Sequence, residues 1–282
     1  MMKLTIVSII VCSLPVLTGQ EESNVDTLLK EAKTAYSKGK TEAALKAAGK
    51  AIKLAPNNPK GYWVRGLMLQ EMRASKDAIR DFRKVIQLTP KDAEPYHQLG
   101  VAYFKSGDAK ASVEAYNQYL KLKPQRKPSH WQRGISFYYT KQYKEGQEQF
   151  EGYQTFDSND VENAVWRYLC MAPRVGTKKA KAEMLKIGDD KRVPMRQIYD
   201  LFIGKLQPKD VLAAVEKGNP TKQQRNARLF YAHLYLGLFY ESEGNAKKAL
   251  HHLKIATKHR IGHYMWDVAR VGRDRLLKSA KQ

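Results

Sequence analysis

The chain has 282 residues, of which 43% are hydrophobic and 10% are aromatic, and it carries a formal net charge of +22. This share of apolar residues is enough for a packed core, which excludes a chain that is disordered throughout. Helix-forming Ala, Leu, Lys, Glu and Gln dominate after the first segment, and runs of β-branched residues are almost absent there. The composition therefore predicts an all-helical fold.

The N-terminal segment has the pattern of a secretory signal peptide. Lys3 supplies a positive charge, residues 4–17 form an apolar stretch, and a small residue precedes the polar sequence that begins at Gln20. These features predict a signal peptide at residues 1–19 and export to the periplasm or cell envelope. Cys12 lacks the small residues that precede a lipid-modified cysteine, so we expect no lipid anchor. The alternative is a segment that stays uncleaved.

The strongest pattern in the chain is a repeat. Pro56, Pro90 and Pro124 are spaced by 34 residues, and each follows an apolar helical segment. Proline ends a helix because it lacks an N–H group and restricts the residue before it. Counting back from each proline gives the same template, with an aromatic or Leu, then Gly or Ala, then Tyr or a substitute, then Ala or Ser, which resembles the tetratricopeptide repeat. The first unit is reduced to small residues at most of these positions. We predict four such helix pairs over residues 25–160.

Glycines occupy two kinds of position in this template. Gly66, Gly100 and Gly134 stand where the first helix of a pair must closely approach the second. Gly39 and Gly107 stand where the chain turns between the helices. Both placements are expected of a stack of helix pairs.

The register loosens after residue 160. We expect Pro173 and Gly176 to interrupt a helix, and the segment 161–220 to be irregular but helical. A fifth unit then returns in residues 221–282, and its last helix, over residues 263–278, is expected to cap the stack. The complete prediction is a right-handed α-solenoid of tetratricopeptide helix pairs with an irregular middle and a C-terminal capping helix. Three short helices are expected in the middle, at 178–187, 195–205 and 208–217.

A further pattern lies within residues 129–277 and consists of His130, Arg133, Gly134, Ile135, Tyr138, Tyr139, Asp157, Asn159, Asp160, Trp166, Tyr168, Leu169, Tyr235, Leu236, Gly237 and Tyr240. In these residues the chain resembles a narrower family, the NlpI family of bacterial envelope adaptors. That family consists of homodimeric lipoproteins that dock other envelope proteins, so the resemblance implies an envelope scaffold and a homodimer. This chain departs from the family in its basic charge and in lacking a lipid-attachment motif.

Positions on the first helix of each pair are predicted to line a concave groove. Large aromatic side chains occur there although the core does not require them, and lysines accompany them. Exposed aromatics beside lysines suit an extended peptide or a helix with acidic residues. The alternative is that they pack on neighbouring helices. The predicted partner-binding residues are Lys33, Tyr36, Lys60, Trp63, His97, Phe104, Trp131 and Tyr138.

No motif in the sequence indicates catalysis. The chain lacks G-x-S-x-G, a phosphate-binding glycine-rich loop and H-E-x-x-H. His259 and His263 are four residues apart, but no carboxylate stands at ligand spacing. Cys170 lies in an apolar helical context and is expected to be a buried thiol. We therefore predict a non-enzymatic protein with no cofactor and no metal site.

The excess of positive charge indicates an anionic partner. Residues 221–282 contain thirteen Lys and Arg against four Asp and Glu, a net charge of +9. An exported protein seldom meets nucleic acid, so an acidic protein or peptide, an anionic membrane or a cell-wall polymer is the better candidate. Two alternatives stay open. One is an ordinary solvated basic surface, and the other is an intracellular or membrane-surface binder of acidic partners that retains its N-terminal segment.

Overall fold

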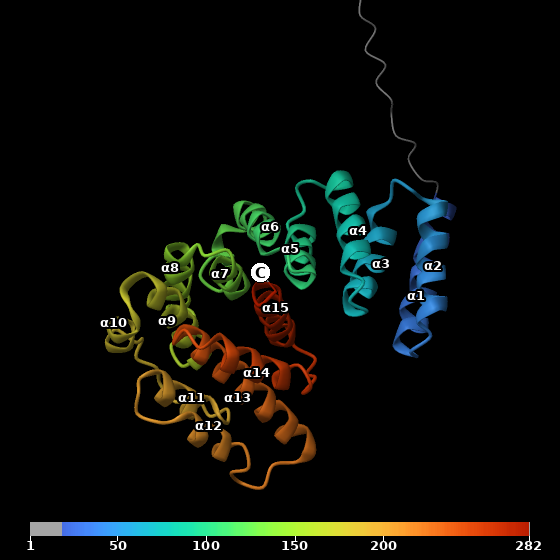
Figure 1. Ribbon diagram of the computed structural model, residues 1–282. Coiled ribbons are helices and arrows are strands. Elements are labelled where there is room, and N and C mark those ends of the chain that lie inside the picture. The colour runs from blue at the N-terminus through green and yellow to red at the C-terminus, as the bar shows by residue number, and fades with distance from the viewer. Residues whose placement is uncertain (1–18, 282) are drawn as a thin grey trace, which may run out of the picture. The chain divides into compact units, whose positions relative to one another are not determined.

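The computed structural model describes residues 19–281, so nearly all of the predicted signal peptide lies outside the described residues. Within that range every regular element is helical, with fifteen α-helices and one short 3-10 turn (Figure 1). This confirms the predicted all-α class. The helices form two compact parts, an N-terminal part (residues 19–91) and a C-terminal part (residues 92–281). Among the described residues no helix has the length and apolar character needed to cross a bilayer.

The N-terminal part consists of two helix pairs. Asn58 starts the third helix by accepting a hydrogen bond from the backbone N–H of Lys60 at 3.0 Å, and Pro59 occupies the first helical position. Gly39 turns the chain between the first two helices with a φ of +71°. The four helices are α1 (Gly19–Ser37), α2 (Thr41–Leu54), α3 (Pro59–Glu71) and α4 (Ser75–Leu88).

The C-terminal part begins with two further helix pairs. Gly107 ends α5 in the left-handed region, with a φ of +90°, and Asp108 then caps α6 by accepting from the N–H of Ala111 at 2.9 Å. The helices are α5 (Glu94–Ser106), α6 (Ala109–Leu122), α7 (Trp131–Tyr139) and α8 (Tyr143–Tyr153), with the 3-10 turn at Pro124–Arg126 between the pairs.

Close helix approach occurs at the predicted glycines. A Cβ atom added to Gly66 would lie 2.9 Å from the ring of Phe82, and one added to Gly134 would lie 2.6 Å from the ring of Phe150. Each ring belongs to the second helix of the same pair and is buried. The expected role of these glycines is confirmed.

Gly100→Ala tests this packing quantitatively. The new methyl carbon would lie 2.5 Å from the buried Tyr116 ring, so either the ring or the helix must move. We expect the free energy of unfolding in urea to fall by about 2 kcal/mol. Gly49→Ala is the control, because α2 has open space at that position. It should stabilise the chain by roughly 1 kcal/mol, and equal destabilisation by both variants would contradict the packing argument.

The rest of the C-terminal part departs from the regular spacing. Pro173 was expected to interrupt a helix, but it lies inside α9, whose end is set by Gly176 with a φ of +83°. Proline removes the N–H that would donate to the Leu169 carbonyl, and α9 continues for only two residues beyond it. The helices are α9 (Val161–Val175), α10 (Thr177–Ala182), α11 (Met195–Phe202), α12 (Pro208–Ala214), α13 (Lys222–Ser242), α14 (Ala246–Ala256) and α15 (Tyr264–Ser279).

The terminal helix α15 contacts both the fifth helix pair and helices of earlier pairs. It packs on α14, and it also lies beside α5 and α7 (Figure 1). The Tyr139 hydroxyl of α7 donates to the Val268 carbonyl at 3.0 Å, and the Arg270 guanidinium donates to the Lys105 carbonyl of α5. The small residue Gly272 leaves room for the Tyr139 hydroxyl. Helix α15 therefore covers the first helices of two earlier pairs.

Candidate functional site

Four of the predicted groove residues share one surface of the N-terminal part, which we call the α1–α3 surface (Lys33, Tyr36, Lys60 and Trp63). Lys60 of α3 forms ion pairs with Asp26 at 3.0 Å and Glu22 at 3.4 Å, both on α1. All three side chains of these pairs are about half exposed. Lys60 is therefore not a free charge, while Lys33 is exposed.

The two aromatic residues of the α1–α3 surface are partly exposed. Trp63 packs edge-on against Phe82, with ring centroids 5.7 Å apart, and keeps part of its surface accessible. The pKa of Tyr36 is raised, first by burial and then by the charge of Glu71 on α3. Helices α1 and α3 thus present aromatic and charged groups side by side.

The predicted exposure is wrong for two residues of the C-terminal part. Phe104 is 0% exposed and stacks on Tyr264 of α15 at a centroid distance of 5.2 Å. Tyr138 is 6% exposed and contacts Trp166 of α9 edge-on at 5.5 Å. Helices α15 and α9 supply these contacts, so the groove positions of α5 and α7 are core positions here. For these residues the packing alternative is correct.

The other two predicted residues, His97 and Trp131, are partly buried. His97 lies among rings, 5.1 Å from Tyr119 and 5.3 Å from His130. Burial, followed by the charge of Arg126, lowers the pKa of His97 to about 4, so its imidazole is neutral at pH 7. Trp131 behaves differently, because it forms one wall of a pocket.

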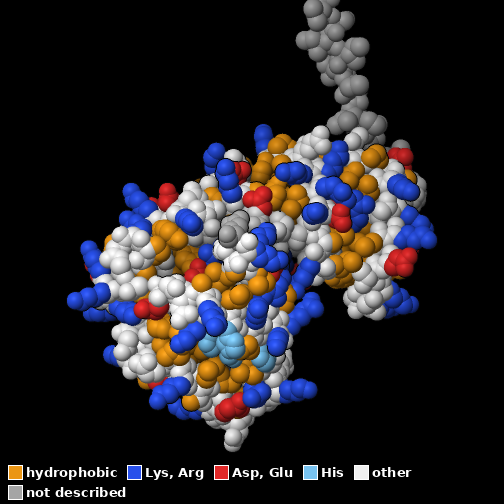
Figure 2. All heavy atoms as spheres, in the orientation of Figure 1, with side chains coloured by type: hydrophobic (Ala, Val, Ile, Leu, Met, Phe, Trp, Pro, Cys, Tyr) orange, Lys and Arg blue, Asp and Glu red, His pale blue; other side chains and the backbone are white. Residues whose placement is uncertain are grey.

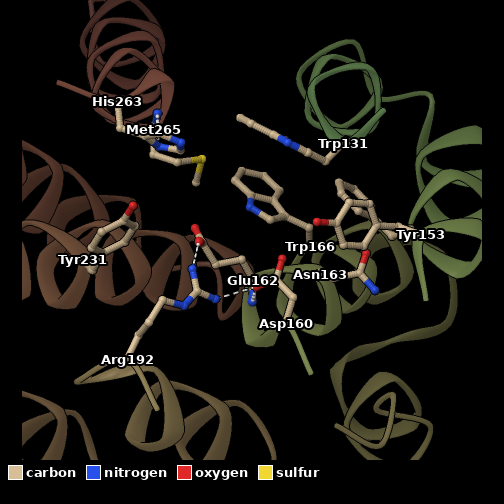
Figure 3. A pocket seen from close by; sticks show the side chains of 11 residues that line it. Trp131, Tyr153, Asp160, Glu162, Asn163, Trp166, Arg192, Tyr231, His263 and Met265 are labelled. Carbon is tan, nitrogen blue, oxygen red and sulfur yellow. Dashed lines mark hydrogen bonds and ion pairs between the residues drawn. The ribbon is translucent and has the colours of Figure 1, made fainter. Parts of the chain in front are cut away.

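This pocket lies wholly within the C-terminal part and has a volume of about 220 Å³. Figure 3 shows Trp131, Trp166 and Met265 around an open space, with Glu162 and Arg192 across from them. We call it the aromatic–carboxylate pocket. It is lined by Trp131, Phe150, Tyr153, Asp160, Glu162, Asn163, Trp166, Arg192, Tyr231, His263 and Met265.

A single guanidinium holds the acidic side of the pocket together. Arg192 pairs with Asp160 at 2.6 Å, with Glu162 at 2.8 Å and with Asp190 at 2.6 Å. The Arg192 side chain is 49% exposed, whereas the three carboxylates are 19%, 13% and 5% exposed in the same order. The Tyr235 hydroxyl also donates to Glu162 at 2.6 Å. With all three carboxylates ionised, the cluster carries two more negative charges than positive ones.

The carboxylates differ in their acidity. Burial raises the pKa of Glu162 and of Asp160, and the charge of Arg192 opposes this in both. Burial alone would also raise the pKa of Asp190, but hydrogen bonds from Arg192 outweigh it and lower that pKa. Ionised Asp160 and Glu162 are thus costly to bury and depend on Arg192.

Other reactive side chains are engaged in packing. Cys170 is 0% exposed, and burial raises the pKa of its thiol, so it is a poor nucleophile. His233 and His252 share a hydrogen bond between Nδ1 atoms at 2.9 Å, which joins α13 to α14. Burial is the main reason that the pKa of each is lowered to about 4. Among the described residues, no three His, Cys, Asp or Glu side chains are grouped to hold a metal ion.

Family models of the tetratricopeptide repeat match the chain in three places. One model matches residues 25–58 and 93–126, and a second, of the TPR repeat, matches residues 76–107. The chain therefore contains tetratricopeptide repeats. Such repeats form non-catalytic scaffolds for protein–protein interaction, in which each helix pair is stabilised by its neighbours. The resemblance of residues 129–277 to the NlpI family is not tested by these matches and stays a prediction.

Solved tetratricopeptide-repeat structures share the fold at low sequence identity. A tetratricopeptide repeat protein from Parabacteroides merdae matches 92% of this chain and 100% of its own, with 14% identity and a TM-score of 0.58. YrrB, a TPR protein with an unusual peptide-binding site, matches 69% and 91%, with 17% identity and a TM-score of 0.53. MamA matches 56% and 87%, with 19% identity and a TM-score of 0.53. No curated protein matches by sequence.

The sequence analysis missed the aromatic–carboxylate pocket. Its residues come from α7, α8, α9, α13, α15 and three loops, so no local spacing unites them. One signal was available, because Asp160, Glu162 and Trp166 fall on one stretch of sequence that mixes carboxylates with a large aromatic. Arg192 gave no signal at all, since it lies in a loop.

Proposed function

We propose that this tetratricopeptide-repeat protein is a non-enzymatic scaffold that binds protein or peptide partners through the α1–α3 surface. The observation that carries the proposal is the position of α15. This helix covers the first helices of the pairs in the C-terminal part, where Phe104 is fully buried. The α1–α3 surface keeps Lys33 exposed and Trp63 partly exposed. A partner can reach aromatic and charged groups there without displacing a helix of the protein.

The chemistry of this surface favours an acidic polypeptide. A partly exposed tryptophan offers apolar contact area, and side chains of this kind supply most of the affinity at protein interfaces. The excess of positive charge, +22 over the whole chain, attracts acidic segments over distances of about a Debye length. On the face drawn in Figure 2, Lys and Arg are scattered and not gathered in one block. This distribution supports a general attraction of acidic partners. The specific contact is then made by the α1–α3 surface.

Export to the cell envelope is the second element of the proposal. It is supported by Lys3, the apolar residues 4–17 and the polar sequence from Gln20, together with the resemblance to envelope adaptors. The same resemblance supports a homodimer. The alternative function is binding of acidic partners inside the cell or at a membrane surface by a chain that keeps its N-terminal segment.

Trp63→Ala tests the α1–α3 surface. Peptides selected on the purified protein from a random display library should bind the variant about 2 kcal/mol more weakly, because the variant lacks the largest accessible apolar side chain of the surface. Isothermal titration calorimetry gives the affinities, and a thermal melt reports the loss of packing on Phe82 separately. Phe156→Ala is the control, since Phe156 is 64% exposed and lies in the C-terminal part. If both variants bind equally well, the surface is wrongly placed.

N-terminal sequencing of the protein purified from cells tests export. We expect a mature chain that begins near Gln20, because the small residue before it suits signal-peptide cleavage. Fractionation of the same cells should then place the protein in the envelope. An intact Met1 would favour the intracellular alternative.

A further inference from the structure

We propose that the aromatic–carboxylate pocket binds an α-ammonium group with its neighbouring carbonyl, as found at the amino terminus of a polypeptide. This site lies in the C-terminal part and does not depend on the α1–α3 surface. Either site can therefore be correct without the other.

The first argument is charge. Three carboxylates lie within hydrogen-bond distance of Arg192, which is the one cation among the described residues that pairs with them. Their side chains are at most 19% exposed, so little water is available to stabilise the excess negative charge. A bound cation would offset it, whereas a bound anion would add to it. The aromatic rings of Trp131 and Trp166 also favour a cation, because the face of an aromatic ring is electron-rich.

The second argument is a pair of buried polar atoms without partners. Within residues 19–281, Trp166 Nε1 and Asn163 Oδ1 have no hydrogen-bond partner, although the two residues are only 2% and 3% exposed. Both residues line the pocket, and Figure 3 shows the Trp166 indole projecting into the space near Glu162. An orphaned buried donor or acceptor costs free energy, so each atom indicates a missing group. The ligand must bring one acceptor and one donor.

An amino terminus supplies both groups, because its ammonium nitrogen and its carbonyl carbon are bonded to the same Cα. Its ammonium can donate to Asn163 Oδ1 and to Asp160, and its carbonyl can accept from Trp166 Nε1–H. Nothing in the hydrogen bonds of Asp160 prevents this, because Arg192 and the Glu162 N–H both donate to the same oxygen, Oδ1. Capture of a terminal amine by convergent acceptors is a known mode of peptide recognition.

The size and walls of the pocket limit the rest of the ligand. Its volume of about 220 Å³ is below the roughly 300–1,000 Å³ of sites for drug-sized molecules, so it suits one residue. Phe150 and Met265 are buried in its wall and favour an apolar first side chain. Arg192 and His263 are exposed and mark the mouth, through which a longer chain could leave. A sugar would also stack on tryptophan, but it would leave the negative charge uncompensated.

Titration with small amides tests the proposal directly. L-Leucinamide carries the ammonium and the carbonyl, N-acetyl-leucinamide lacks the charge, and n-butylammonium lacks the carbonyl. Binding is followed by calorimetry and by the indole N–H signals of the uniformly ¹⁵N-labelled full chain. We expect leucinamide to shift the Trp166 signal in a saturable manner. The acetylated probe should bind about ten- to a hundredfold more weakly, because a charged hydrogen bond is lost.

Two variants connect this binding to the pocket. Asp160→Asn should weaken leucinamide about tenfold, while Asn preserves the helix cap that Asp160 provides to the Glu162 N–H. Glu162→Gln is a second variant with the same expectation. Asp157→Asn is the matched control, because it removes the same charge close by but does not line the pocket. A thermal melt of each variant confirms folding.

The outcomes are decisive. Equal binding of leucinamide and N-acetyl-leucinamide, tighter binding of glucose, or no saturable binding of any amine would each overturn the proposal. Equal weakening by Asp160→Asn and Asp157→Asn would do the same. A final comparison separates two sources of the group. Leu-Ala-Ala-amide should bind more tightly than leucinamide if the natural ligand is a polypeptide, and equally if it is a free amino-acid amide.

Discussion

Phe104→Ala should lower the free energy of unfolding by about 4 kcal/mol, the largest effect that we expect of any single substitution in this protein. The ring is fully buried, stacks on Tyr264 at 5.2 Å and meets Tyr139 edge-on at 5.3 Å. Its removal leaves a cavity between α5, α7 and α15 that these helices cannot close without moving. Urea denaturation followed by circular dichroism gives the value.

The same variant should also loosen α15 selectively. Hydrogen exchange of the α15 amides should quicken more than exchange in α2, because the Phe104–Tyr264 contact is one of the contacts that join α15 to α5. Phe156→Ala is the control, since Phe156 is 64% exposed and its loss should cost less than about 1 kcal/mol. A Phe104→Ala variant as stable as this control would mean that α15 does not pack against α5.

The sequence predicts the helix pairs well because their contacts are local. Gly66 meets Phe82, and Gly134 meets Phe150, so each contact joins residues sixteen apart within one template. A pattern that repeats along the chain reveals contacts of this kind directly. Pro173 was misleading because proline disfavours a helix interior without excluding it, and α9 ends instead at Gly176, three residues later.

The candidate site was predicted less well, for a physical reason. Whether a groove position is exposed depends on what covers it, and Phe104 is covered by Tyr264, far away in the chain. No spacing in the sequence predicts that α15 packs against α5. Trp63 was predicted to be exposed on the first helix of the second pair, and in the structure it lies on α3 and is partly exposed. Its role in binding stays a prediction.

Arg192→Ala should lower the free energy of unfolding by about 3 kcal/mol at pH 7.5. Removing one partner from a buried ion pair costs roughly 3–5 kcal/mol, and the lower end applies because Arg192 is 49% exposed. The substitution leaves Asp160, Glu162 and Asp190 facing one another without a counter-charge. Arg225→Ala is the control. Its pair with Glu216 is exposed on both sides, at 52% and 55%, and should contribute less than about 1 kcal/mol.

The pH dependence of this deficit identifies its cause. Arg192 lowers the pKa of each of the three carboxyls, so its loss raises each folded-state pKa. A carboxyl with a folded pKa above its unfolded value destabilises the chain when ionised, and this penalty fades as the pH falls through the folded pKa toward the unfolded one. The Arg192→Ala deficit should therefore shrink by about 1 kcal/mol between pH 7.5 and pH 5. A deficit that stays constant over this range would mean that Arg192 stabilises the loop by packing and not by charge.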